Sequence, residues 1–243
     1  MNSLVFVHGY LGGSAQWAGQ VETFANYFQV ITPDLPGFGL NSVKEAPVTI
    51  RDFATYVLDE LDNKGIDRFH LVGHSMGGMI VQEMVALSPE RVDKLVLYGT
   101  GPLGSLPGRF ETLSDSKRKV SEEGVEATGR RIAATWFLHG EVAEGYQVCA
   151  DLAVKTSTQA AIAGLSAMET WSGVASLSKI PCSTLILWGD QDRAYQWSQP
   201  EQLLREIDDA RLAVIPGCSH AVHLEKPGIF NATLLDFLLP ARS

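Results

Sequence analysis

The sequence is poor in cysteine and in positive charge. Its 243 residues include 3 cysteines, and 19 Lys and Arg stand against 28 Asp and Glu, which gives a formal net charge of -9. Cys149, Cys182 and Cys218 are odd in number and widely spaced, so they form neither a disulfide framework nor a metal-binding pattern. We expect buried free thiols in a reducing compartment. The acidic balance argues against nucleic acid or an anionic membrane as partner.

Targeting and anchoring segments are also missing from the sequence. The N-terminus has no basic region, and the apolar run at residues 4–7 is too short for a signal peptide. No stretch approaches the ~20 apolar residues that span a bilayer. Internal repeats, low-complexity tracts and long charge blocks are absent as well. We therefore expect a cytoplasmic protein, monomeric or homodimeric, that acts on a small molecule.

Short apolar runs alternate with amphipathic segments in both end portions of the chain. Runs typical of buried strands lie at residues 4–7, 30–31, 69–72, 95–98, 184–188 and 212–215. Helical periodicity is found at residues 16–28, 50–61, 79–87, 200–207 and 228–239. Strands separated by helices predict an α/β fold with a doubly wound, mostly parallel sheet. In such sheets ligands bind beyond the carboxyl ends of the strands.

The alternation breaks in the middle of the chain. Between residues 102 and 180 we find helical patterns, clearest at 125–137 and 158–171, and no convincing strand. The sequence thus predicts a core formed by residues 1–101 and 181–243. Residues 102–180 are expected to be a helical insertion between two core strands.

One turn carries the strongest chemical signal. Gly73-His74-Ser75-Met76-Gly77 matches G-x-S-x-G and lies between a strand pattern and a helix pattern. A serine at a strained strand-to-helix turn needs neighbours without a Cβ, so that the backbone can reverse tightly. The pattern predicts that the Ser75 hydroxyl projects from the end of the sheet as a candidate nucleophile.

A serine hydroxyl is a weak nucleophile at neutral pH and needs a base, usually histidine. His220 lies in the loop after the last strand, where a turn can bring its imidazole to Ser75, and we favour it. His223 lies in the same loop and is the weaker alternative. The remaining histidines are assigned no catalytic role: His8, which we expect to hold its own loop by hydrogen bonds, His70, His74 and His139.

The acid that orients the base should also lie at a strand end. The strand at residues 184–188 runs into Gly189-Asp190-Gln191-Asp192, so either aspartate is available. We favour Asp192, and expect the other to be a turn residue bonded to its own backbone.

Together these stretches resemble the α/β-hydrolases, in particular the compact, cap-bearing, esterase-like group. The resemblance spans nearly the whole chain. Its matching stretches are His8-Gly9-Tyr10, Asp34-Leu35-Pro36-Gly37-Phe38-Gly39, Gly73-His74-Ser75-Met76-Gly77-Gly78, Gly189-Asp190-Gln191-Asp192, and His220 with Glu225-Lys226-Pro227.

The resemblance implies roles for individual residues. Ser75 is the implied nucleophile, Asp192 the acid and His220 the base, and the backbone amides of Tyr10 and Met76 form the implied oxyanion hole. The insertion corresponds to the family's helical cap. Members often begin with an antiparallel hairpin, whereas this chain starts almost at the His-Gly strand. We therefore expect a sheet of about six strands.

The expected function is hydrolysis of a small to medium carboxylic ester through an acyl-enzyme, which needs no metal or organic cofactor. Alternatives within the fold are cleavage of a C–C bond in a ring-cleavage product, where relatives often carry Asn in place of His74, and lactone or amide hydrolysis. A remote alternative is a non-catalytic ligand receptor. Candidate substrate-binding residues are Trp136, Phe137, Met168, Trp171 and Tyr195. Basic residues expected to lie on solvated helix faces rather than to bind an acidic substrate are Lys117, Arg118, Lys119, Arg130 and Arg131.

Overall fold

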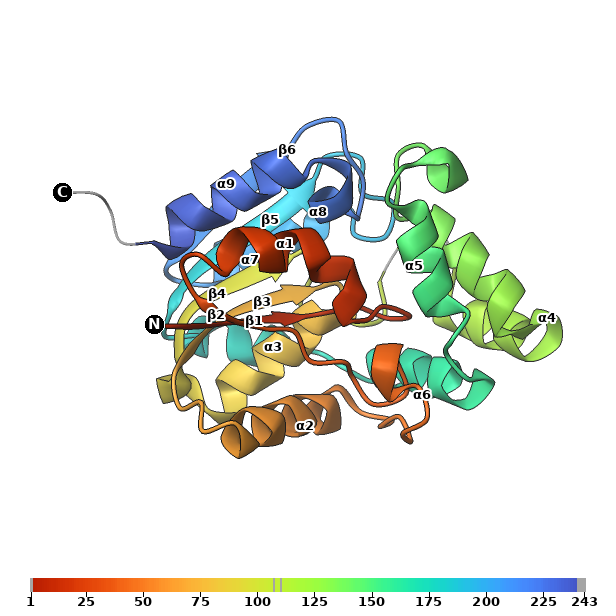
Figure 1. Ribbon diagram of the computed structural model, residues 1–243, viewed down its shortest axis with the longest axis horizontal. Coiled ribbons are helices and arrows are strands. Elements are labelled where there is room, and N and C mark those ends of the chain that lie inside the picture. Colours follow the sequence, from red (N-terminus) through yellow and green to blue (C-terminus); the bar gives the residue numbers. More distant parts are fainter. Residues whose placement is uncertain (1, 107, 110, 240–243) are drawn as a thin grey trace.

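The centre of the molecule is a parallel sheet (Figure 1). The structure, a computed structural model, describes residues 2–106, 108–109 and 111–239. The sheet has 6 strands in the order β2-β1-β3-β4-β5-β6, and each neighbouring pair is parallel. The strands are β1 (Ser3–Val7), β2 (Gln29–Ile31), β3 (Phe69–His74), β4 (Val92–Tyr98), β5 (Ser183–Gly189) and β6 (Ala210–Ile215). The predicted fold class is confirmed.

Helices connect the strands and cover both faces of the sheet. The α-helices are α1 (Ala18–Phe24), α2 (Ile50–Asn63), α3 (Met76–Leu87), α4 (Leu113–Ala134), α5 (Tyr146–Ala153), α6 (Thr158–Glu169), α7 (Ser198–Glu206), α8 (Val222–Glu225) and α9 (Pro227–Leu238). Short 3₁₀ turns are η1 (Ser14–Trp17), η2 (Gly39–Asn41), η3 (Pro89–Arg91), η4 (Gly140–Val142) and η5 (Val174–Lys179).

Alternate residues of each strand feed two separate apolar cores, because successive side chains point to opposite faces. Leu4 and Phe6 pack with α1 and α9 on one face. Val5 and Val7 pack with α2 and α3 on the other. Both faces are therefore dry, which is why the strands read as continuous apolar runs in the sequence.

Helices α4, α5 and α6 lie together to one side of the layered core, beyond one end of the sheet (Figure 1). They belong to residues 102–180, and among the described residues of that segment the β-type pairing is one isolated bridge between Leu103 and Ser172. Helix α4 is broken at Gly124, whose φ of 83° and ψ of 164° are not helical. Its second half matches the predicted helix at residues 125–137.

Several helical elements differ from the prediction, among them α8, which lies in the segment that we expected to be a loop. The first half of α4 is rich in charge, so its buried face, which includes Ser116 and Val120, gave a weak apolar period. Helix α5 spans only 8 residues, too short for a clear pattern. The predicted helix at residues 16–28 begins as the η1 turn and ends at Phe24, because the chain must turn there into β2.

The cysteines agree with a further expectation. Cys149, Cys182 and Cys218 are buried and free. Burial raises their thiol pKa values to about 12, 11 and 12 respectively, so they are unreactive at neutral pH. Within the described part of the chain, no helix combines the length and apolar character needed to cross a bilayer.

A cluster of charges fixes the start of α4. Ser116 Oγ donates to Glu111 Oε1 at 2.6 Å, and Lys119 and Arg131 pair with the same carboxylate. Burial by itself would raise the pKa of Glu111. The hydrogen bonds from Lys119, Ser116 and Arg131 outweigh burial and lower this pKa to about 2.

This cluster predicts an acid limb in stability. The folded-state pKa of Glu111 lies below its ordinary 4.5, so the unfolded chain binds more protons at low pH. The contribution of Glu111 is therefore present above about pH 4.5 and is lost as the pH falls towards 2. Glu111→Gln should flatten the dependence of the unfolding free energy on pH in that window, measured by urea denaturation. Glu123→Gln, at an exposed position of the same helix, is the control. An unchanged acid limb in Glu111→Gln would contradict the assignment.

Candidate active site

The order of the strands places a crevice beside β1. The chain runs from β1 outward to β2 and then crosses to β3 on the other side of β1, so the connections diverge between β1 and β3. Open parallel sheets bind ligands at such a point, beyond the carboxyl ends of the strands. Tyr10 follows β1 and Ser75 follows β3. Asp192 and His220 follow β5 and β6.

Ser75 occupies a strained backbone position. Its φ of 57° and ψ of -119° lie outside the regions that residues with a Cβ normally adopt. The strain is held by fixed neighbours. Ser75 N–H donates to Tyr98 O at 3.0 Å, and Ser75 O accepts from Gly78 N at 2.9 Å and from Thr100 Oγ1 at 2.8 Å. Such strain is typical of functional turns, and Ser75 directly precedes the first turn of α3.

Two glycines let the loop after β1 approach this turn. A Cβ on Gly9 would lie 3.0 Å from Ser75 Cβ, and a Cβ on Gly77 would lie 2.3 Å from Val7 O. The close approach brings the backbone at Tyr10 next to the start of α3, where Met76 is the first helical residue. N–H groups in a first helical turn lack acceptors within their own helix. Tyr10 is fixed by its hydroxyl, which donates to Ala161 O at 3.1 Å.

His220 and Asp192 meet across two strand ends. His220 Nδ1 lies 2.8 Å from Asp192 Oδ2, and the two side chains are 1% and 0% exposed. Asp192 Oδ1 accepts from the backbone N–H groups of Ala194 at 2.7 Å and Tyr195 at 3.1 Å, so the carboxylate is locked in place. The bond to Nδ1 leaves Nε2 of His220 for a second partner. Asp190, the alternative acid, instead accepts from Gly217 N–H at 2.7 Å.

Other histidines brace this arrangement. His223 Nδ1 lies 2.9 Å from the Tyr98 hydroxyl, which also lies 2.9 Å from His220 O. Burial lowers the pKa of His223 to about 3, helped by the neighbouring His220, so His223 is too weak a base to activate a hydroxyl. His74 Nε2 lies 3.1 Å from His220 O, behind the loop. His8 accepts from Leu35 N–H at 3.0 Å through Nε2, which fits the structural role we expected.

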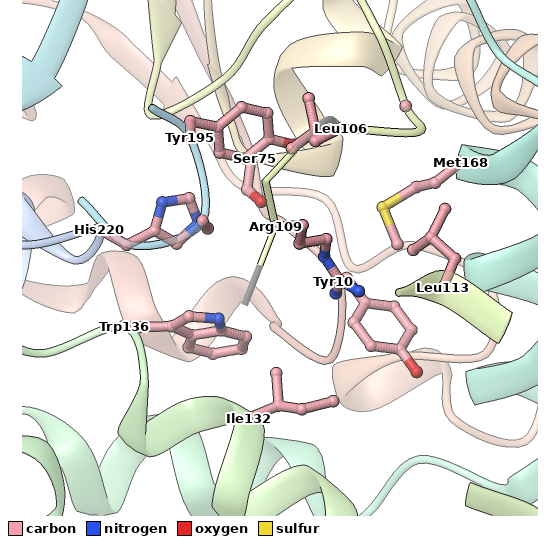
Figure 2. Close-up of a pocket in the computed structure, with 12 residues that line it drawn as sticks. Tyr10, Ser75, Leu106, Arg109, Leu113, Ile132, Trp136, Met168, Tyr195 and His220 are labelled. Atoms are coloured by element: carbon pink, nitrogen blue, oxygen red, sulfur yellow. The ribbon is translucent and has the colours of Figure 1, made fainter. Parts of the chain in front are cut away.

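A cavity of about 30 Å³ opens at Ser75 and His220. Figure 2 shows twelve residues of its wall, with Trp136 and Tyr195 near His220. The Tyr195 ring stacks on the imidazole with 5.6 Å between ring centroids. Burial raises the pKa of Tyr195 to about 12, although the Ser75 hydroxyl beside it acts in the opposite direction. Met168 also lines the cavity. Three of the five residues predicted to bind substrate therefore lie at this wall.

The other two lie elsewhere, and we no longer assign them to the substrate pocket. Phe137 packs edge-on against Tyr146 at 6.4 Å and lines a separate cavity near Leu224. Trp171 donates its indole N–H to Glu83 at 2.9 Å, which anchors it to α3. The sequence shows that both residues are aromatic. It does not show whether their side chains point towards the cavity at Ser75.

Comparison with known proteins agrees with the fold. The family model described as "alpha/beta hydrolase fold" matches residues 2–227. The chain belongs to the α/β-hydrolase family.

Individual relatives align with almost the whole length of this hydrolase chain. It is 29% identical to a protein named as a carbamate hydrolase, RutD, of Pseudomonas savastanoi pv. phaseolicola, over 97% of this chain and 93% of that one. It is 27% identical to the 2-hydroxy-6-oxo-6-phenylhexa-2,4-dienoate hydrolase of Comamonas testosteroni, over 97% and 87%. The crystal structure of the enol-lactonase from Burkholderia xenovorans LB400 superposes with a TM-score of 0.89 at 24% identity, covering 98% and 91%.

The expected solvated position holds for Arg118, which is exposed, whereas the other four basic residues of α4 are half-buried. Each pairs with a carboxylate, and none lines the cavity at Ser75. The pairs are Lys117–Glu169, Arg118–Glu122, Lys119–Glu111, Arg130–Glu126 and Arg131–Glu111. Among the described residues, no group of three or more His, Cys, Asp and Glu side chains could hold a metal ion.

Sequence reasoning missed Arg109, which lines the cavity from the loop before α4. Its sequence neighbours gave no motif, and its place depends on how that loop folds back over the sheet.

It also assigned no role to Glu225, although the residue lies in one of the matching stretches. Glu225 Oε1 accepts from Leu138 N–H and Oε2 accepts from Ser219 N–H, both at 2.6 Å. Its carboxylate thus joins the loop of His220 to the segment that carries Trp136, and Ala221 N–H reinforces the joint by donating to Trp136 O at 2.9 Å.

The strain at Ser75 predicts an unusual order of stabilities. Ser75→Gly should be more stable than Ser75→Ala by about 1 kcal/mol, because glycine relieves a positive φ that alanine retains. Chemical denaturation of both variants measures the difference. The same pair at Ser88, whose φ is -145°, should show the reverse order. Equal stabilities at Ser75 would mean that its backbone is not strained.

The Glu225 carboxylate should matter for stability far more than its partial exposure suggests. Glu225→Gln replaces one acceptor oxygen by an NH₂ group facing an N–H donor, so the unfolding free energy should fall by roughly 2 kcal/mol. Glu144→Gln removes the same charge from an exposed residue that lines the same outer cavity as Glu225, and should have almost no effect. Thermal unfolding of the two variants side by side makes the comparison, and similar melting temperatures would refute the bridge.

Proposed function

We propose that this α/β-hydrolase cleaves a small to medium carboxylic ester through an acyl-enzyme, with Ser75 as nucleophile, His220 as base and Asp192 as the acid that orients the base. The observation that most directly supports this is the 2.8 Å contact between His220 Nδ1 and Asp192 Oδ2, because His220 lines the same cavity as Ser75. Residues 102–180 are proposed to act as the cap over this cavity.

In the proposed reaction, Ser75 Oγ attacks the acyl carbon while Nε2 of His220 takes the hydroxyl proton. The tetrahedral intermediate collapses as the imidazolium returns this proton to the departing alcohol. Water, deprotonated by the same nitrogen, then attacks the acyl-enzyme and releases the acid. Asp192 stabilises the imidazolium in both halves of the cycle and holds the imidazole in the required tautomer.

The backbone N–H groups of Tyr10 and Met76 are the proposed oxyanion hole. The approach of the β1 loop to the start of α3, which Gly9 and Gly77 permit, supports this placement. Donors fixed in this way need no reorganisation as charge develops, and one such donor is worth roughly 10²–10³ in rate.

The size of the cavity limits the substrate. About 30 Å³ is room for one or two water molecules, so an ester enters only if the side chains around the cavity or the cap move. A larger leaving group requires the cap to move. Trp136, Met168 and Tyr195 are the proposed substrate contacts. The chemistry needs no cofactor, and the cytoplasmic location stays a prediction.

A second candidate is hydrolysis of a C–C bond in a ring-cleavage product. The 27% identity to a dienoate hydrolase favours it. The identity of residue 74 does not, because those relatives often carry Asn where this chain has His74, whose ring bonds to the backbone of His220. Steady-state rates with p-nitrophenyl acetate and butyrate, set against a dienone acid, separate the two candidates. If the protein turns over neither the esters nor the dienone acid, the result favours the receptor alternative.

A fluorophosphonate probe tests the nucleophile. Wild type should be labelled stoichiometrically and Ser75→Ala should not be labelled, as measured by intact-mass spectrometry. In steady-state assays, Asp192→Asn should retain only about 10⁻⁴ of the wild-type kcat, because the imidazole then adopts the wrong tautomer. Undiminished labelling of Ser75→Ala would refute the proposal.

A further inference from the structure

We propose that Arg109 makes this site selective for a substrate that carries a carboxylate a few bonds from the scissile ester. The inference rests on the proposed function and names the substrate class. It comes from the position of one cation in an otherwise uncharged cavity.

Arg109 belongs to the wall that Ser75 and His220 share. It lies in the loop between β4 and α4, and Figure 2 shows its side chain among those that line the cavity, with Ser75 and Tyr10. A group bound against Arg109 is therefore in the same chamber as the reacting serine.

The remainder of that wall carries no fixed charge. Of the twelve lining residues, Arg109 alone is permanently charged. The others are Tyr10, Ser75, Gly104, Leu106, Leu113, Ile132, Trp136, Met168, Ala194 and Tyr195. Apolar walls screen charge poorly, so the attraction between a cation and a bound anion is stronger here than in water.

Arg109 is hydrogen-bonded both to its own loop and to helix α4. Nη1 donates to Glu111 O at 2.7 Å and to Ser116 Oγ at 3.3 Å. The Glu111 carboxylate attracts Arg109, but it is itself bound by Lys119 and Arg131. Burial lowers the pKa of Arg109 below its ordinary value, and the tyrosines at positions 195 and 10 oppose that change. A guanidinium starts so high that it stays charged at neutral pH.

A guanidinium recognises a carboxylate better than it recognises other small groups. Its N–H donors form a planar fork that matches two carboxylate oxygens, and the paired charges strengthen both bonds. Arg109 and Ser75 line the same cavity, so only a short spacer separates a carboxylate at Arg109 from an acyl carbon at Ser75. The fitting substrate is thus a half-ester of a short dicarboxylic acid, or an ester whose leaving group bears the carboxylate.

Two matched pairs of esters test both placements of the charge. The first pair is p-nitrophenyl hydrogen glutarate and p-nitrophenyl valerate, in which a methyl group replaces the carboxylate. The second is 4-acetoxybenzoate and 4-methylphenyl acetate, which place the charge on the leaving group. The uncatalysed rate is subtracted for each ester, because a neighbouring carboxylate accelerates spontaneous hydrolysis. For wild type, kcat/KM should favour the anionic member of at least one pair by about tenfold or more.

Arg109→Met should lower that anionic-to-neutral ratio by at least about tenfold, and Arg109→Lys should retain part of it because the charge remains without the fork. Arg130→Met is the control, since Arg130 pairs with Glu126 on the outer side of α4 and should leave the ratio at its wild-type value. If the methionine variant does not fold, the lysine variant and protection of wild type by free glutarate against fluorophosphonate labelling, compared with butyrate, provide the test.

The outcomes separate this inference from the proposed function. Turnover of the neutral esters without preference for either anion, or an equal ratio in Arg109→Met and wild type, overturns the role of Arg109 and leaves the serine mechanism standing. Absence of Ser75 labelling in wild type overturns the proposed function itself.

Discussion

The hydrogen bond between His220 Nδ1 and Asp192 Oδ2 is the contact on which the candidate site depends. The two residues are 28 positions apart and come together because β5 and β6 are adjacent and parallel, so that their carboxyl ends open at one edge. Secondary bonds hold each partner. Backbone N–H groups of Ala194 and Tyr195 fix the carboxylate, and the carbonyl of His220 accepts from the Tyr98 hydroxyl. A pair buried to this degree is costly unless such bonds satisfy it.

Strain and close packing bring Ser75 to the same edge. The turn holds a serine at positive φ, and its backbone is fixed by two backbone–backbone hydrogen bonds, one hydrogen bond from the Thr100 side chain, and the close approach of Gly77 to β1. The loops at the end of the sheet on one side and helices α4 and α6 on the other line a small chamber. Glu225 joins these two parts by bonding both the His220 loop and the segment after Trp136. The position of the proposed base is therefore linked to the wall that a substrate would contact.

Features with a local signature could be predicted from the sequence, and features that depend on tertiary packing could not. Apolar runs located the strands, and the spacing of glycines around Ser75 located the turn, because both follow from short-range backbone physics. Chain order then placed Asp192 and His220 at strand ends. Arg109 and the inward or outward placement of Trp136, Phe137 and Trp171 depend on how the helices after β4 fold over the sheet. No period or motif in the insertion encodes that arrangement. The first half of α4 is so rich in charge that the sequence did not predict it as a helix.

The proton between His220 and Asp192 gives the most direct measurement of the central claim. Proton NMR of protein labelled with ¹⁵N at histidine should show an Nδ1–H resonance of His220 downfield of the amide region. The account predicts that this resonance disappears in Asp192→Ala and persists in Asp190→Ala, because Asp190 bonds to the backbone of Gly217 instead. Persistence of the resonance in Asp192→Ala, or its loss in Asp190→Ala alone, would contradict the account.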